Sequence, residues 1–145
     1  MKKKKEYSFK EIKSILPYQY PFLFIDKAAL IKKGKKIICT KSVSGNEYYF
    51  VGHFKDNPVM PGAILMESMA QSAYLLGALS WDKKYSVCYL GGINDMRFIK
   101  PVYPGDQLTI EIEVKTRMKN AELVEAKAFV DSNLVCKGEL IIVKR

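Results

Sequence analysis

One histidine and one carboxylate stand out by their surroundings in this 145-residue chain. His53, the only histidine, lies in a Gly-His-Phe turn, and Glu67 follows within a stretch of Ala, Ile, Leu and Met. The ordinary pKa of histidine lies closest to neutrality, which makes it a natural general base or acid. The two residues therefore suggest acid–base chemistry in a dry pocket. The alternative is a packed histidine and a solvated glutamate.

The elements that must position these two side chains are a long loop and a long helix. Residues 45–60 are rich in glycine, asparagine and aromatic residues, and form a loop that is long for a compact domain. Pro61 suits the first turn of a helix, where its missing N–H costs nothing. Residues 62 to about 80 are mostly apolar, which predicts a helix enclosed by the rest of the protein. Glu67 and Gln71 are four residues apart and share a face of it.

Shorter elements flank this helix along the chain. A capping box of Ser8 and Glu11 predicts a helix over residues 9–16. The expected strands are residues 23–33, 36–44, 85–94, 107–117, 122–130 and 134–143. Together they predict an α+β fold in which one antiparallel sheet wraps around a central helix. Covering that helix on every side takes more sheet than one small chain easily provides, so we expect a dimer with a continuous sheet.

Composition limits the classes of function. The length fits one domain, and we expect residues 1–7 to be a flexible basic tail before a single domain over residues 8–145. No apolar run reaches membrane-spanning length and no signal peptide is recognisable, so we expect a cytoplasmic protein without a membrane partner. The cysteines are few and far apart, and a single histidine cannot build the usual zinc site, so we expect no metal: Cys39, Cys88 and Cys136.

The net charge of +9 comes almost entirely from lysine. Such a charge favours acidic partners by electrostatic steering. Nucleic acid, an acidic carrier protein and simple solubility are all compatible with it. The basic residues are scattered and no nucleic-acid-binding motif is present, so we expect no nucleic acid partner.

Five segments resemble the 3-hydroxyacyl-[acyl-carrier-protein] dehydratases of the FabZ type, in the order and spacing of that family. They are Leu16-Pro-Tyr-Gln-Tyr-Pro-Phe-Leu-Phe-Ile-Asp26, Gly52-His-Phe54, Pro58-Val-Met-Pro-Gly62, Glu67-Ser-Met-Ala-Gln71 and Arg97-Phe-Ile-Lys-Pro-Val-Tyr-Pro-Gly-Asp106. The resemblance runs from about residue 9 to residue 143. It implies a hotdog fold, a homodimer that is commonly part of a trimer of dimers, an acyl carrier protein as partner, and no cofactor.

The resemblance also implies an activity and its residues. The family removes water from 3-hydroxyacyl thioesters to give trans-2-enoyl thioesters, in fatty acid biosynthesis. Its catalytic histidine and glutamate fall on His53 and Glu67, with His53 of one subunit facing Glu67 of the other. The N–H of Gly62 would hold the thioester carbonyl. The related dehydratase–isomerases of the FabA type have aspartate at the position of Glu67, which favours the plain dehydratase.

Further site positions are less specific. The resemblance suggests that Phe54 and Pro61 wall the pocket. Gln71 either orients the Glu67 carboxylate or satisfies buried backbone groups. An apolar setting should raise the pKa of Glu67 and keep it protonated as an acid. The basic residues best placed to dock the carrier protein are Arg97 and Lys100. Alternatively, the two residues are simply solvated surface charges.

Two departures from the family concern the entrance rather than the catalytic pair. Relatives usually have His-Arg where this chain has Tyr18 and Gln19, and proline where it has Lys55. These changes put the chain-length preference and carrier docking in doubt. A hotdog thioesterase is the second hypothesis, because the fold hosts several chemistries. A basic module that binds RNA or DNA is the third.

Overall fold

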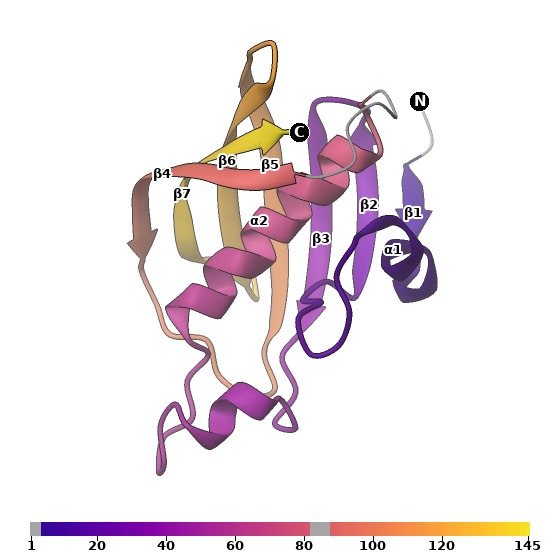
Figure 1. Cartoon of the computed structure of the whole chain (residues 1–145). Coiled ribbons are helices and arrows are strands. Elements are labelled where there is room, and N and C mark those ends of the chain that lie inside the picture. The colour runs from indigo at the N-terminus through magenta and orange to yellow at the C-terminus, as the bar shows by residue number, and fades with distance from the viewer. Residues whose placement is uncertain (1–3, 82–87) are drawn as a thin grey trace.

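A computed structural model describes residues 4–81 and 88–145 of the chain. Its strands form one antiparallel sheet in the order β1-β2-β3-β5-β6-β7-β4. The elements are β1 (Lys5–Tyr7), α1 (Phe9–Ile15), β2 (Lys27–Lys32), β3 (Lys36–Ser42), η1 (Tyr48–Val51, a 3-10 helix), α2 (Gly62–Ala78), β4 (Cys88–Phe98), β5 (Gln107–Arg117), β6 (Ala121–Val130) and β7 (Asn133–Lys144). The sheet curves around α2, while α1 lies beside β1 and β2 (Figure 1). The predicted α+β arrangement is confirmed.

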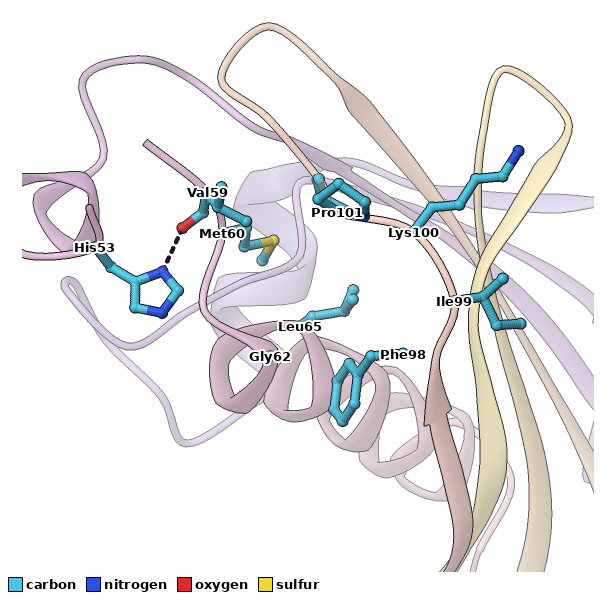
Figure 2. Close-up of a pocket in the computed structure, with 10 residues that line it drawn as sticks. His53, Val59, Met60, Gly62, Leu65, Phe98, Ile99, Lys100 and Pro101 are labelled. Carbon is cyan, nitrogen blue, oxygen red and sulfur yellow. Dashed lines mark hydrogen bonds between the residues drawn. The ribbon is translucent and has the colours of Figure 1, made fainter. Parts of the chain in front are cut away.

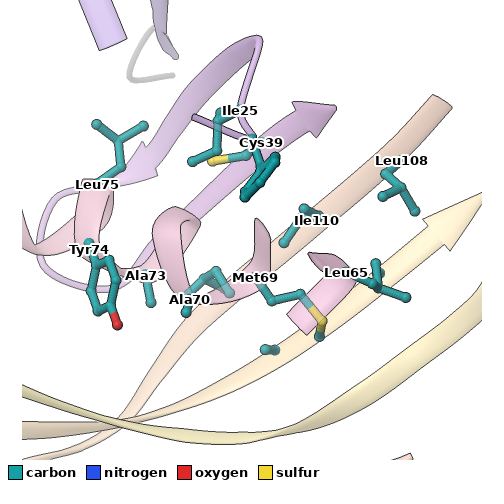
Figure 3. Close-up of a cluster of buried hydrophobic side chains, with 14 of the residues drawn as sticks. Ile25, Cys39, Leu65, Met69, Ala70, Ala73, Tyr74, Leu75, Leu108 and Ile110 are labelled. Carbon is teal, nitrogen blue, oxygen red and sulfur yellow. The ribbon is translucent and has the colours of Figure 1, made fainter. Parts of the chain in front are cut away.

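Helix α2 is the centre of the core. Every residue from Ser68 to Gly77 is buried, whereas the first turns are partly covered and the last residue, Ala78, is exposed. Its side chains pack with those of β3 and β5, as the cluster around Met69, Cys39 and Ile110 shows (Figure 3). One chain therefore covers most of α2, and the argument that a second sheet is needed applies only to residues 62–67. Neither helix of the described residues is long and apolar enough to cross a membrane.

Strands β5 and β6 follow the alternation that their sequences predict. In β5 the inward side chains are all buried, namely Leu108, Ile110, Ile112 and Val114. The outward side chains of neighbouring strands carry opposite charges that approach each other, as between Lys36 and Glu111 at 3.9 Å. Such exposed pairs add little stability, so apolar burial on the inner face accounts for the strand's position.

The N-terminal boundary differs from the expected one. Lys5–Tyr7 form β1, which pairs with β2 at the edge of the sheet, and Tyr7 is buried. The tail was expected because the lysine run at residues 2–5 is typical of a solvated terminus. Antiparallel pairing with the edge of β2 nevertheless suffices to place residues 5–7. Residues 1–3 lie outside the described part of the chain.

Three predicted strands differ from the observed ones by more than one residue at an end. The strand predicted over residues 23–33 begins only at Lys27, because the backbone of Phe24 bonds to a glutamine side chain of α2 instead of to a strand. The strand predicted over residues 85–94 has its first residues outside the described ranges and continues to Phe98 through two register shifts. The strand predicted over residues 36–44 ends at Ser42.

Candidate active site

His53 lies on a loop that closes on itself just after η1. The backbone N–H of Val59 donates to the carbonyl of His53 at 2.8 Å, and the His53 Nδ1 lies 2.7 Å from the carbonyl oxygen of Val59. Inside this ring, Phe54 and Asn57 exchange backbone hydrogen bonds at 3.3 Å in both directions. The loop therefore fixes both the backbone and the ring of His53 (Figure 2).

The contact with Val59 determines which ring nitrogen carries the proton. A carbonyl oxygen can only accept, so the Nδ1 of His53 must donate, and in the neutral imidazole the Nε2 is then an acceptor. Nε2 is consequently the atom that can take a proton from a bound molecule. The loop orients the His53 ring as a general base at Nε2 needs.

The loop is also anchored to the body of the protein on both sides. Before His53, Tyr49 and Phe50 of η1 are buried in the core. After it, the N–H of Met60 donates to the carbonyl of Val102 at 2.8 Å, and the Met60 side chain is buried. These contacts explain how a segment without long regular structure can hold a side chain in one place.

A cavity of about 310 Å³ opens beside His53. Its wall includes the loop, the first turns of α2 and the segment after β4, contributed by His53, Val59, Gly62, Leu65, Phe98 and Lys100 among others. Most of these groups are apolar, and His53 supplies the titratable ring. A small apolar cavity with few polar groups is the usual form of a ligand site.

Gly62 starts α2 at the edge of this cavity. A Cβ at this position would lie 3.0 Å from Cε1 of Phe98, so the aromatic ring occupies the room that a side chain would need. The N-terminus of α2 has no side-chain cap and no acidic residue in its first turn. Its free N–H groups and the helix dipole favour a partly negative oxygen there.

Glu67 lies further along α2 and is half-buried. The Nε2 of Gln71 donates to its Oε1 at 3.1 Å. Burial raises the pKa of the Glu67 carboxyl above its ordinary value of 4.5, and the Gln71 hydrogen bond opposes this shift in part. The expected raised pKa of Glu67 is therefore confirmed in direction, with desolvation as the larger cause.

Gln71 fills both of the roles that the sequence left open: it contacts the Glu67 carboxylate and it satisfies buried backbone groups. Besides contacting Glu67, it accepts from the backbone N–H of Phe24 and donates to the carbonyl of Phe22, each at 2.9 Å. The side chain is completely buried. It thus ties the segment before β2 to α2 and fixes one oxygen of the Glu67 carboxyl.

The structure does not bring Glu67 to His53 within one chain. Leu65 lines the cavity, and Glu67, two residues later, is rotated by about 200° around the helix axis from it. Glu67 accordingly does not belong to the cavity wall. One chain contains the two halves of the predicted catalytic pair in separate places.

Of the remaining predicted positions, Lys100 lines the cavity, and Phe54, Pro61 and Arg97 do not. Phe54 stacks on His53 with ring centroids 3.9 Å apart and is 55% exposed, while Pro61 precedes the first residue of α2 without lining the cavity. Lys100 lines the cavity with an exposed side chain that extends away from His53 (Figure 2). Arg97 lies outside it, and its guanidinium contacts the carboxylate of Asp95 at 3.0 Å.

Two residues of the site were not expected from the sequence. Val59 acts through its carbonyl, which no side-chain pattern reveals. Phe98 lies beyond the strand predicted to end at residue 94, so its ring was not expected over Gly62.

Tyr18, which departs from the family at the expected entrance, stacks on Tyr74 with ring centroids 6.2 Å apart. Burial, together with the nearby charge of Glu67, raises the pKa of Tyr18 to about 12.

Comparison with known proteins agrees with this geometry. A model of the FabA-like domain matches residues 16–139. The chain belongs to the FabA-like family. It is 45% identical to the 3-hydroxyacyl-[acyl-carrier-protein] dehydratase FabZ of Dechloromonas aromatica, over 93% of this chain and 96% of that protein. It is 40% identical to the enzyme of the same name from Ruminiclostridium cellulolyticum, over 90% and 92% of the two chains. The predicted FabZ-type resemblance is thereby confirmed.

Solved structures support the fold. The dehydratase heterocomplex ApeI:P of Xenorhabdus doucetiae matches with a TM-score of 0.76 and 17% identity, over 92% of this chain and 90% of that one. A mutant thioesterase from Pseudomonas aeruginosa matches with a TM-score of 0.63 and 10% identity, over 78% and 76% of the two chains. At these identities the likeness concerns the fold, and the hotdog fold is confirmed.

Proposed function

We propose that this FabA-like protein is a 3-hydroxyacyl-[acyl-carrier-protein] dehydratase that forms trans-2-enoyl thioesters for fatty acid biosynthesis. The observation that carries the proposal is the 2.7 Å contact of the His53 Nδ1 with the Val59 carbonyl, which leaves Nε2 as a base beside an apolar cavity. The names of the relatives support the same reaction. No cofactor or metal takes part in it, and the cytoplasmic location remains a prediction.

The proposed elimination uses three groups. His53 Nε2 takes the proton from C2 of the (3R)-3-hydroxyacyl thioester while the C2–C3 double bond forms. The C3–O bond breaks, Glu67 in its protonated form gives its proton to the hydroxyl, and water leaves. The Gly62 N–H donates to the thioester carbonyl, on which negative charge develops. Each proton transfer is worth roughly 10²–10⁴-fold in rate, and the fixed donor roughly 10²–10³-fold.

The proposed working unit is a dimer, because Glu67 lies outside the cavity of its own chain. Strand β4 offers the pairing edge: among the described strands it bonds only to β7, and it exposes Tyr89, Ile93 and Phe98. A long apolar edge of this kind invites pairing with another chain. A second copy paired along β4 would bring Glu67 of one subunit to His53 of the other. Three such dimers would give the hexamer.

An assay of the purified protein tests the reaction. With 3-hydroxybutyryl acyl carrier protein, the enoyl-thioester absorbance should rise to an equilibrium that is also reached from the crotonyl thioester. His53→Ala should reduce the rate by roughly 10²–10⁴-fold. Release of free thiol without enoyl formation would instead identify a thioesterase and overturn the proposal.

Hybrid dimers test the shared site. His53→Ala and Glu67→Gln chains, each nearly inactive alone, are co-expressed with different tags and the mixed dimers are isolated. Each mixed dimer contains one complete site if the site spans two subunits, so about half of the wild-type activity per dimer should return. Mixed dimers that remain inactive would show that the two residues do not meet across the interface.

Carrier docking is proposed at the mouth of the cavity. Lys100 combines exposure with a place on the cavity wall, whereas the guanidinium of Arg97 is already engaged by Asp95. An acidic carrier protein would meet Lys100 as it delivers the thioester. Phe54, which covers one face of the His53 ring, is the proposed apolar neighbour of the incoming arm.

A further inference from the structure

A lysine lies on the core face of the sheet near the catalytic loop. In β3 the side chains of Ile37, Cys39 and Lys41 alternate inward, and Lys41 is only 5% exposed. Lysine is almost never buried unless its charge is paired. The buried ammonium group of Lys41 therefore needs an oppositely charged partner, which an apolar side chain at this position would not need.

That partner is Glu47, the residue before η1. The Nζ of Lys41 lies 2.5 Å from Oε1 of Glu47, and both side chains are largely covered. The backbone of Glu47 is held as well, because its N–H donates to Ser44 and its carbonyl accepts from Phe50, each at 3.2 Å. Glu47 thus joins β3 to the short helix that leads into His53.

The strand that carries Lys41 is a fixed support. It is paired on both sides, by β2 and by β5, with Lys41 opposite Leu108. Val43, just beyond the strand, exchanges backbone hydrogen bonds with the turn at residues 105–106. On the other side of the ion pair, five residues separate Glu47 from His53, and of these Tyr49 and Phe50 are buried. The ion pair is therefore a polar link between the sheet and the catalytic loop.

We propose that the Lys41–Glu47 ion pair is a positioning device that holds η1 against β3, so that the His53 ring keeps its hydrogen bond to Val59 and its bare Nε2. The kinetic consequence rests on the proposed dehydratase function. The structural consequence does not, because the tautomer of the ring can be observed without substrate. His53 is the only histidine in the chain, so its ring nitrogen signals are unambiguous.

The test compares Glu47→Gln with the wild type by ¹⁵N NMR of the imidazole and by kinetics. The wild-type ring should show one neutral tautomer with the proton on Nδ1. Glu47→Gln should show a mixture of tautomers, together with a fall in kcat of about tenfold and a nearly unchanged KM, because small displacements of a catalytic group cost rate. Retention of the single tautomer, or of the wild-type kcat, would overturn the proposal.

Two further variants separate positioning from stability. Lys36→Met removes an exposed ion pair on the same strand, with Glu111 at 3.9 Å, and should change neither the tautomer nor kcat. The double variant Lys41→Met with Glu47→Gln leaves no unpaired buried charge, so its thermal unfolding should recover toward wild type. Its tautomers should stay mixed; a return to the single tautomer along with stability would reduce the ion pair to a purely structural role. If the wild type dehydrates nothing, the proposed function fails and the tautomer result still decides this inference.

Discussion

The two halves of the proposed site are built in opposite ways. His53 lies on an irregular loop, where the ring depends on a single backbone carbonyl, and beside an open cavity. Glu67 lies in the second turn of a 17-residue helix, half-buried, where the carboxyl depends on one buried glutamine. The loop thus fixes its side chain through the backbone, and the helix fixes its side chain through another side chain.

This difference corresponds to the different demands on a base and an acid. The base must be neutral and present a specified nitrogen, so its half needs geometry. The acid must keep its proton, so its half needs desolvation, which raises the pKa of Glu67. The loop half should therefore respond to changes in geometry and the helix half to changes in pH.

Replacing the two proposed catalytic groups should give the largest effects. Glu67→Gln should lower kcat by roughly 10²–10⁴-fold, as should His53→Ala, because each removes one proton transfer. The contrast lies in the pH profile of kcat/KM: Glu67→Gln should lose the alkaline limb, which reports loss of the acid's proton. Steady-state rates across pH measure both. An unchanged alkaline limb in Glu67→Gln would assign the acid to another group.

Helices and strands whose own residues carry a periodic or capping pattern were predictable from the sequence. Strand β5 was predicted with its observed bounds, and α2 was predicted from Gly62 because proline followed by an apolar run specifies a buried helix. The capping box of Ser8 and Glu11 is also present, with hydrogen bonds in both directions at 2.7 and 3.3 Å.

Features that depend on contacts between distant segments were not predictable. Strand β1 exists because β2 offers it an edge, and β2 starts late because Gln71 takes the backbone of Phe24. For the site, the residue types and spacing pointed to His53 and Gly62, which share one cavity. The tautomer of His53 was not accessible, because it depends on where the Val59 carbonyl points.

Removing the support of the helix half should cost stability. Gln71→Leu leaves the buried N–H of Phe24 without its acceptor, and an unsatisfied buried group costs about 1–3 kcal/mol. Ser72→Ala is the matched control on the next position of α2, because the Ser72 hydroxyl contacts the Ser68 carbonyl, at 2.8 Å, and the Cys39 thiol instead of accepting from a backbone N–H. Urea unfolding measures both. Equal losses for the two variants would show that Gln71 has no special supporting role.

The raised pKa of Glu67 predicts a pH-dependent stability. The folded protein binds this proton more tightly than the unfolded chain, so the contribution is present below the ordinary value of 4.5 and is lost as pH rises through the raised pKa. Glutamine does not titrate. Glu67→Gln should therefore gain in unfolding free energy relative to the wild type as pH rises above the ordinary value of 4.5, by a small amount because the carboxyl is partly exposed. A parallel pH dependence of the two proteins in urea unfolding would contradict the shift.

The smallest effects should come from the basic residues beside the His53 half. Lys100→Ala should raise KM for a carrier-bound substrate by about 2–5-fold, as exposed charges contribute modestly, and the effect should shrink with added salt. Arg97→Ala should raise KM less, because part of its charge is neutralised by Asp95 at 3.0 Å. The same acyl group on a small thiol, which lacks the carrier's acidic surface, should show no change in either variant. If Lys100→Ala raised KM equally for the small thioester, Lys100 would act on the acyl chain inside the cavity, and the mouth of the His53 half would not be the docking surface.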